Sequence, residues 1–228
     1  MFQGKGMPTD GIEREFKFLL ASDRERAALE ALLPPPKRRL CQRNLFFDTA
    51  DRAVVRAGYS VRLREEGGRW TLTAKGPCLK PFPGPTRRRQ AERAVPAPLA
   101  RHLEAGTADP LPLLRRASPA GVALALARAI EEAAGGAALL PRGSFRNERA
   151  EIPLRLPSGL PAVLALDRTA FDNDTSELEV ELELEDDGAA EPAEAWLAEL
   201  FTRAGIPLRP ALSKRARFEA RRNPASGR

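Results

Sequence analysis

The stretch from Ser176 to Asp187 reads SELEVELELEDD, with glutamate at every second position of its first ten residues and leucine or valine between the glutamates. This period of two predicts a β-strand with one acidic face and one apolar face. Neighbours on one face of a strand lie about 7 Å apart, and at an effective dielectric of about 20 two ionised glutamates at that distance repel by roughly 2 kcal/mol. Two explanations remain: an edge strand whose acidic face lies in water, or cationic groups that face the acidic strand.

The 228-residue chain is long enough for one large domain or two small ones, and its 43% hydrophobic residues predict a globular protein. It has no apolar run near the roughly 20 residues that a membrane span needs, and we expect no signal peptide. The spacing of Cys41 and Cys78 suggests neither a zinc site nor a disulfide framework, so we expect a reducing, cytoplasmic location. His102 is the only histidine, which argues against Ser-His-Asp and Cys-His catalysis.

The net charge of +6 suggests a polyanionic partner: nucleic acid, a membrane surface or a phosphate-rich small molecule. Arginine outnumbers lysine 31 to 6, a bias that a GC-rich genome would produce without any functional cause. Against that bias each lysine is informative, because its compact ammonium group suits a phosphate oxygen.

The rest of the chain alternates predicted strands with a few predicted helices. Strand patterns cover residues 11–20, 38–49, 59–66, 69–76, 87–95, 144–156 and 160–171. Helical patterns cover residues 23–33, 96–141 and 191–205, and within the second we expect one helix over 119–134 with Ser118 as its N-cap. Gly67-Gly68 predicts a hairpin turn, and residues 78–86 are expected to form a loop. A basic segment, residues 208–222, follows the last helix.

Many of these strands are polar on one face, and the polar faces are sorted by type. They read Glu-x-Glu-x-Lys at 13–17, Arg-x-Arg at 62–64, Thr-x-Thr-x-Lys at 71–75 and Glu-x-Glu at 179–181. A barrel of about eight strands has an interior that can hold one small ligand. If the sorted faces point inward, they suit a polyphosphate bound by Lys and Arg and bridged to carboxylates by Mg²⁺ or Mn²⁺.

The residues Glu13-x-Glu15-x-Lys17 resemble the N-terminal signature of the CYTH superfamily, the triphosphate tunnel metalloenzymes. The run FFDTADRAVVRAGYSVRLREEGGRWTLTAKGP resembles the family's second to fourth strands, and VLALDRTAF, ELEVELE and LSKRARFE resemble its later segments. The layout is most similar to the CYTH domain of bacterial inorganic triphosphatases. The resemblance implies a mainly β (α+β) fold, an eight-stranded antiparallel β-barrel forming a tunnel, with flanking helices. Residues 12–220 would form this domain, with 1–11 and 221–228 as flexible termini.

The resemblance also implies roles for residues by position. The metal ligands would be Glu13, Glu15, Glu92, Asp167, Glu179 and Glu181. The residues that bind substrate phosphates would be Lys17, Arg62, Arg64, Lys75, Arg88, Arg149 and Lys214. The catalytic set would be Glu13, Glu15, Lys75, Glu179 and Glu181. Glu183 is a further candidate ligand, Arg217 is expected near the tunnel exit, and Glu177 and Glu185 are expected at the solvated ends of the strand.

In the fifth and sixth strands, the choice of the phosphate-binding arginine is open, and the fifth strand also departs from the family pattern. Gln90 stands where the fifth strand usually carries a second carboxylate, and three consecutive arginines leave the choice between Arg88 and its neighbours Arg87 and Arg89 open. In the sixth strand the choice lies between Arg146 and Arg149. Arg149 is preferred because it lies farther after the phenylalanine at 145, as the family's arginine does.

We therefore expect metal-dependent hydrolysis of a triphosphate, with inorganic tripolyphosphate as the first candidate and phosphate as a product. Class IV adenylate cyclase, which converts ATP to cyclic AMP and pyrophosphate, and thiamine triphosphatase are alternatives with the same core. A non-enzymatic RNA or polyphosphate binder would explain the net charge but not the acidic strand, and aromatic residues for stacking on bases are few. We expect a small-molecule substrate and no nucleic-acid or membrane partner, and a homodimer stays open.

Overall fold

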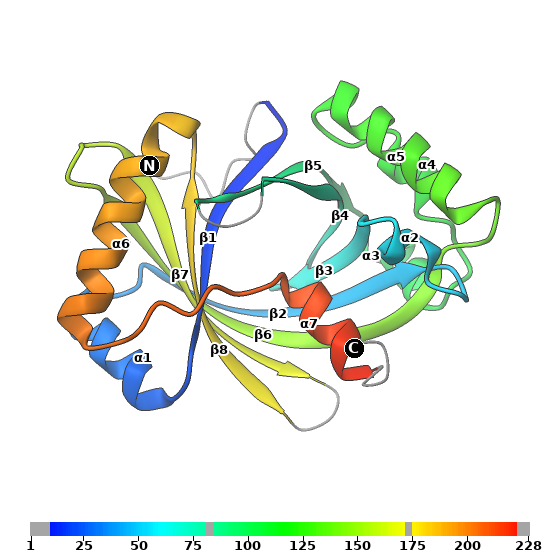
Figure 1. The fold of residues 1–228 in the computed structure, drawn as a ribbon. Helices are drawn as coiled ribbons and strands as arrows, with labels where there is room; N and C mark the ends of the chain where they lie inside the picture. The colour runs from blue at the N-terminus through cyan, green and yellow to red at the C-terminus, as the bar shows by residue number, and fades with distance from the viewer. Residues whose placement is uncertain (1–9, 81–83, 172–174, 223–228) are drawn as a thin grey trace. The chain divides into compact units, whose positions relative to one another are not determined.

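The computed structural model describes residues 10–80, 84–171 and 175–222, and within these ranges the chain forms eight β-strands and seven α-helices (Figure 1). The strands are β1 (Ile12–Leu20), β2 (Arg38–Asp48), β3 (Ser60–Glu66), β4 (Arg69–Lys80), β5 (Thr86–Val95), β6 (Leu140–Arg155), β7 (Pro161–Phe171) and β8 (Ser176–Leu184). The helices are α1 (Asp23–Glu30), α2 (Ala53–Arg56), α3 (Ala97–Glu104), α4 (Leu111–Leu114), α5 (Ala120–Ala134), α6 (Ala190–Ala204) and α7 (Lys214–Arg222). Among these described helices, none combines the length and the apolar composition needed to cross a lipid bilayer.

The strands follow the order β1-β5-β4-β3-β2-β6-β7-β8, and the sheet closes on itself as a barrel. The pairs β2–β3, β3–β4, β4–β5 and β7–β8 are antiparallel. The predicted fold class, mainly β with an eight-stranded antiparallel barrel and flanking helices, is therefore confirmed. The chain divides into two compact units: unit 1 is Met1–Arg14 with Leu40–Arg146, and unit 2 is Glu15–Arg39 with Asn147–Arg228.

Unit 1 is built on the antiparallel strands β2 to β5. The β3–β4 hairpin turns at Gly67-Gly68, where both residues have positive φ (56° and 78°), as a two-residue turn that matches the strand twist requires. Alternate residues such as Leu63 and Leu72 are fully buried and belong to one apolar cluster with Leu103 of α3 and Ile130 of α5. The other positions on these strands are mostly polar, so the strands of unit 1 have one apolar and one polar face.

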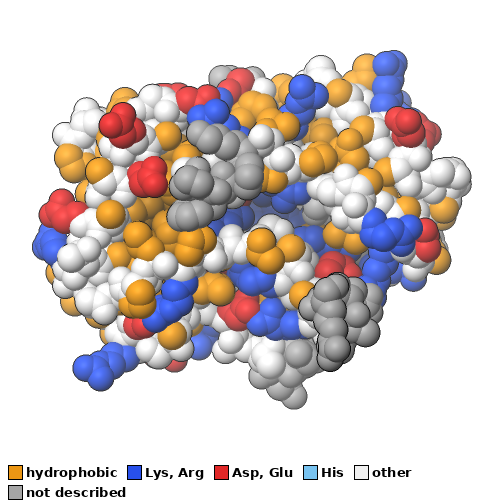
Figure 2. Space-filling view, viewed as in Figure 1, with side chains coloured by type: hydrophobic (Ala, Val, Ile, Leu, Met, Phe, Trp, Pro, Cys, Tyr) orange, Lys and Arg blue, Asp and Glu red, His pale blue; other side chains and the backbone are white. Residues whose placement is uncertain are grey.

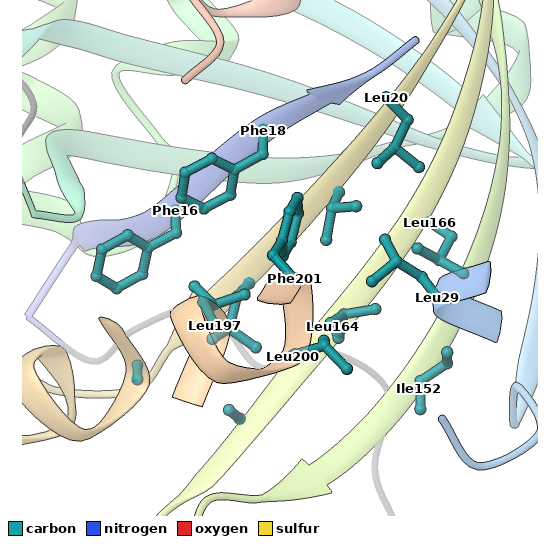
Figure 3. Close-up of a cluster of buried hydrophobic side chains, with 14 of the residues drawn as sticks. Phe16, Phe18, Leu20, Leu29, Ile152, Leu164, Leu166, Leu197, Leu200 and Phe201 are labelled. Atoms are coloured by element: carbon teal, nitrogen blue, oxygen red, sulfur yellow. The ribbon is translucent and has the colours of Figure 1, made fainter. Parts of the chain in front are cut away.

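Unit 2 has its own apolar core between its strands and helices α1 and α6. Figure 3 shows Phe16 and Phe18 of β1 on the same side as the helix that carries Phe201, and the rings of Phe18 and Phe201 lie 5.2 Å apart. Leu164 of β7 and Leu29 of α1 belong to the same cluster. Since side chains alternate between the two faces of a strand, this core turns the polar residues of the same strands to the opposite face.

Several elements differ from the sequence prediction. β4 continues to Lys80, where the prolines predict a loop, because Cys78 pairs with Arg88 of β5. Ser118 is not the N-cap of α5: its backbone pairs with that of Glu92, and Pro119 takes the cap position.

Two of the observed helices, α2 and α7, are absent from the sequence prediction. Of the termini predicted to be flexible, residues 10–11 and 221–222 are described, and the latter two end helix α7. Residues 1–9 and 223–228 lie outside the described residues.

Replacing Phe201 with alanine removes a side chain that is 1% exposed from the core of unit 2. We expect the free energy of unfolding to fall by about 3–5 kcal/mol, because the cavity adds to the lost burial. Leu212→Ala is the control: Leu212 is 71% exposed, and its loss should change stability by less than about 0.5 kcal/mol. Urea unfolding followed by circular dichroism measures both variants, and equal losses would contradict this account of the core.

Candidate functional site

The acidic strand β8 is buried. Glu179 and Glu181 are 1% and 4% exposed. The antiparallel strand β7 places Asp167 opposite Glu179 and Ala165 opposite Glu181. The explanation of an edge strand in water is therefore wrong. Because β7 offers no cation at these positions and like charges directly opposite are destabilising, other elements must balance the carboxylates.

Lys214, the first residue of α7, balances three of these carboxylates at once. Its Nζ lies 2.6 Å from Glu179, 2.7 Å from Asp167 and 2.7 Å from Glu181. An ammonium group has three donors, so one lysine can serve three acceptors. Figure 2 shows cationic and acidic side chains intermixed on the surface around α7.

Arg149 of β6 is the second shared cation. Its Nε donates to Asp167 Oδ1 at 2.9 Å and its terminal nitrogen to Asp167 Oδ2 at 2.7 Å, a bidentate pair. The same guanidinium contacts Glu181 and lies 3.4 Å from Glu183. Arg149 is 6% exposed, whereas Arg146 is exposed. The structure therefore brings Arg149, and not Arg146, into contact with the acidic strand.

The N-terminal signature contributes a third cation. Lys17 of β1 lies 2.6 Å from Glu15 and 3.5 Å from Glu181. Together with Arg217 of α7, which lies 2.7 Å from Glu179, these residues form one group. We call it the charge cluster: Glu15, Lys17, Arg149, Asp167, Glu179, Glu181, Glu183, Lys214 and Arg217.

The two ends of the acidic run behave differently. Glu177, which the sequence places at a solvated end, is half-buried and pairs with Arg217 at 2.7 Å and with Arg221. That expectation is wrong, because Arg217 and Arg221 of the unpredicted helix α7 contact Glu177. Glu185 is exposed, as expected.

Burial and ion pairing act in opposite directions on the ionisable groups of the cluster. Burial raises the pKa of Asp167, but the charges of Arg149 and then Lys214 outweigh it and lower the pKa to about 2. Burial likewise opposes ionisation of Glu181, and Lys214 leads the attractions that hold its pKa well below its usual range. Burial lowers the pKa of Lys214, but the facing carboxylates more than compensate and raise it overall. All three groups are therefore charged at neutral pH.

Two sets of carboxylates in unit 2 bring oxygen atoms within 4.8 Å of one another: Glu15, Glu181 and Glu183, and Asp167, Glu179 and Glu181. All of these donors are carboxylate oxygens, the ligands that hard divalent ions such as Mg²⁺ and Mn²⁺ prefer. The donor set therefore fits the metal that the resemblance implies. Four of the six predicted metal ligands are gathered here, and Glu183 joins them.

The other two predicted metal ligands, Glu13 and Glu92, belong to unit 1. Glu13 is 7% exposed, and both of its carboxylate oxygens accept from Lys75 Nζ, at 2.5 and 2.7 Å. Glu92 accepts from the hydroxyl of Thr73 at 3.0 Å and from the amide of Gln90 at 3.2 Å. Gln90, the departure from the family pattern, thus acts as a hydrogen-bond donor to the carboxylate that remains.

Each of three predicted phosphate-binding arginines of unit 1 has a hydrogen bond to an uncharged group. Arg62 lies 3.5 Å from the hydroxyl of Thr73, and Arg64 donates its Nε to the buried amide oxygen of Asn44 at 3.1 Å. Arg88 donates to the backbone carbonyls of residues 76 and 58, at 2.7 and 3.2 Å.

Along β5, Arg88 is two residues from Gln90 and four from Glu92, so strand alternation places the three on one face. Arg87 and Arg89 belong to the other face. The predicted choice of Arg88 is therefore the one that shares a face with Glu92.

The sequence analysis did not identify the neutral polar residues that hydrogen-bond to Asp167 of the charge cluster and to each other. Asn147 of β6 donates to Asp167 Oδ1 at 3.1 Å and accepts from the hydroxyl of Thr169 of β7 at 2.8 Å. Asn147 lies two residues before Arg149, and Thr169 two residues after Asp167. That spacing puts each on the same face as a charged member of the cluster and is the one signal that could have identified them.

The sequence profile of the CYTH domain matches residues 11–218. The chain belongs to the CYTH domain family. No curated protein has a sequence that matches it. CYTH membership and the clustered carboxylates together place the chain in a family of metal-dependent enzymes that bind triphosphates.

Solved structures share the CYTH fold. A Hippeastrum protein, described as a proposed adenylyl cyclase with a dominant triphosphatase activity, is 24% identical with a TM-score of 0.72, covering 91% of this chain and 95% of that one. A Bacillus halodurans protein, proposed to be an adenylate cyclase, is 21% identical with a TM-score of 0.67, covering 91% and 98%. Protein PH1819 of Pyrococcus horikoshii OT3 is 14% identical with a TM-score of 0.57, covering 92% and 99%. At these identities the likeness shows the fold.

The ion pairs of the cluster predict a specific loss of stability in acid. Because the pKa of Asp167 is lowered from 3.8 to about 2, the unfolded chain binds more protons than the folded protein between these values, and stability falls as the pH drops through that window. Asp167→Asn should flatten this fall by up to about 1.4 kcal/mol per pH unit. Urea unfolding in chelator at a series of acidic pH values measures the slope. Glu185→Gln controls for loss of one carboxylate, and a wild-type slope in Asp167→Asn would refute the ionic role.

Proposed function

We propose that this CYTH protein hydrolyses the terminal phosphoanhydride of inorganic tripolyphosphate with Mg²⁺ or Mn²⁺ and releases phosphate. The observation that carries this proposal is the charge cluster of unit 2. Buried carboxylates whose oxygens lie within 4.8 Å of one another share Lys214 and Arg149 as counter-ions. The cluster thus combines oxygen ligands for a hard metal ion with cations for phosphate.

The proposal follows from how these charges would change partners on binding. Without ligands, each cation neutralises a carboxylate. A divalent ion alone would leave Lys214 and Arg149 without their counter-ions, and a triphosphate alone would face the carboxylates of β8. When both bind, the carboxylates hold the ion and the cations hold phosphate oxygens, so every buried charge stays paired. Metal and triphosphate should therefore increase each other's affinity.

Bound metal would polarise phosphate oxygens and activate a water molecule. In the hydrolysis, the oxygen of a water molecule would form a bond to the terminal phosphorus while the bond from that phosphorus to the bridging oxygen breaks. A proton of the water would pass to solvent, which leaves phosphate and diphosphate. Lys17, Arg149 and Lys214 are the groups in unit 2 that would bind phosphate oxygens and stabilise the charge that develops on the leaving diphosphate. For Arg62, Arg64, Lys75 and Arg88 of unit 1, phosphate binding stays a prediction from the resemblance.

Two neighbours bear on the choice of reaction. The Hippeastrum protein is described as having a dominant triphosphatase activity, which makes hydrolysis the first candidate for this chain. The description of the Bacillus halodurans protein as a proposed adenylate cyclase keeps ATP cyclisation as the second. The cations of unit 2 do not separate the two reactions, since both begin with a metal-bound triphosphate.

Glu181→Gln tests the metal role, because Glu181 belongs to both carboxylate sets. The variant keeps the size of the side chain and removes the charged ligand, and we expect metal-dependent phosphate release from tripolyphosphate to fall by at least about 100-fold. Glu185→Gln, the same change at an exposed position of the same acidic run, should keep wild-type turnover. Phosphate release and the melting temperature are measured for both. Near-wild-type turnover in a folded Glu181→Gln variant would refute the proposed metal site.

A substrate panel separates the candidate reactions. Tripolyphosphate, ATP and thiamine triphosphate are each incubated with the full chain and Mg²⁺ or Mn²⁺, and phosphate, pyrophosphate and cyclic AMP are quantified. We expect the highest turnover on tripolyphosphate, with phosphate as product and no cyclic AMP from ATP. Cyclic AMP with pyrophosphate would select the cyclase instead, and preferred turnover of thiamine triphosphate would select the third candidate.

A further inference from the structure

Asn147 and Thr169 are the buried neutral members of the polar face that carries the charge cluster. Their exposed fractions are 2% and 1%. Asn147 is on β6, two residues from Arg149, and Thr169 is on β7, two residues from Asp167. The amide donates to Asp167 Oδ1 at 3.1 Å and accepts from the threonine hydroxyl at 2.8 Å. The two residues therefore form a chain of hydrogen bonds that ends on a carboxylate of the cluster.

The direction of this chain is fixed by chemistry. Arg149 and Lys214 together donate to both oxygens of Asp167, so a carboxylate paired with these two cations only accepts hydrogen bonds. Asn147 must therefore turn its NH₂ group to Asp167, which leaves its carbonyl oxygen for Thr169. That oxygen only accepts, so the hydroxyl of Thr169 must donate to it. Removing the hydroxyl would leave the buried amide oxygen without this donor and remove one of the contacts that orient the amide.

The orientation of Asp167 matters because its two oxygens serve different cations. Oδ1 accepts from Asn147 and from Arg149 Nε at 2.9 Å. Oδ2 accepts from Arg149 at 2.7 Å and from Lys214 at 2.7 Å. Rotation about the last bond of an aspartate side chain has broad minima, so the carboxylate plane needs partners to hold it. The amide of Asn147 is the one uncharged side-chain donor that the described residues place on that carboxylate.

We propose that Asn147 and Thr169 are positioning residues: through Asp167 they hold Arg149 and Lys214 in the geometry that binds triphosphate. This inference rests on the proposed function of the same cluster. Two buried polar groups that served packing alone could be replaced by apolar groups of similar shape at little cost. A positioning pair could not be replaced in this way at little cost. The carboxylate of Asp167 would lose its fixed orientation, and Arg149 and Lys214 would lose theirs with it.

The test compares Thr169→Val, which keeps the shape and removes the hydroxyl, with Thr169→Ser, which keeps the hydroxyl. Thr202→Val is the matched control, because Thr202 is an exposed threonine on α6 whose hydroxyl bonds the carbonyl of residue 198. We expect Thr169→Val to raise the KM for tripolyphosphate at saturating Mg²⁺ about three- to tenfold, with a smaller effect on kcat. Thr169→Ser should stay within about twofold of wild type.

A second readout needs no substrate. The Nε–H of Arg149 is buried against Asp167, so its ¹⁵N–¹H resonance, assigned by its loss in Arg149→Lys, should exchange slowly with solvent. Thr169→Val should speed that exchange by about threefold or more, and Thr169→Ser and Thr202→Val should not. If the wild type releases no phosphate from any triphosphate, the proposed function fails while this readout still decides whether the pair holds Asp167.

The remaining outcomes also decide the inference. Unchanged KM and unchanged exchange in folded Thr169→Val would overturn it. A lower melting temperature with an unchanged KM would show a structural role alone and overturn it as well. Failure of Thr169→Ser to restore both readouts would show that the hydroxyl is not the group that acts.

Discussion

Several carboxylates can lie side by side on β8 only because cations from other elements share them. Burying an unpaired charge costs several kcal/mol, and removing one partner of a buried pair typically costs about 3–5 kcal/mol. Lys214 contacts three carboxylates at 2.6 to 2.7 Å. The attachment of α7 depends on the same contacts, since its Lys214 and Arg217 pair with β8 and its Phe218 is fully buried. A helix that follows β8 and α6 in the chain is thus attached to β8 by ion pairs and by one buried aromatic ring.

The polar faces of the two units differ in chemistry. In unit 2 the cations meet carboxylates, and the groups are held at short distances with shifted pKa values. In unit 1 the Arg64 guanidinium is held through Nε by the neutral amide of Asn44. A guanidinium held by an amide keeps its whole charge available to an anion, because its partner neutralises none of it. Unit 1 thus holds Arg64 through a neutral group and Lys75 through the carboxylate of Glu13, whereas every cation of the charge cluster in unit 2 pairs with a carboxylate.

The strands, the hairpin at Gly67-Gly68 and the acidic face of β8 followed from the sequence because a period of two fixes which side chains share a face. Arg149, Asp167 and Lys214 were predicted from the family resemblance alone. Helix α7 could not be predicted from a repeating pattern. In its sequence, KRARFEARR, Phe218 is the one apolar residue larger than alanine, and the ion pairs that attach the helix follow no periodicity. The burial of Glu177 was missed for the same reason, since it depends on Arg217 and Arg221 of that helix. Asn147 and Thr169 were missed because neutral polar residues on a strand look solvated until the partner strand is known.

The positive net charge of the chain is a poor guide to what the cluster binds. The cluster contains the five carboxylates Glu15, Asp167, Glu179, Glu181 and Glu183 and the four cations Lys17, Arg149, Lys214 and Arg217. A protein that bound RNA or polyphosphate by charge alone would gain nothing from burying carboxylates beside its lysines, because they cancel the attraction and repel the ligand. The same carboxylates become an advantage only if a divalent ion arrives with the anion and takes them as ligands. The excess of acids over bases in the cluster therefore favours a metal-dependent enzyme over a polyanion-binding protein.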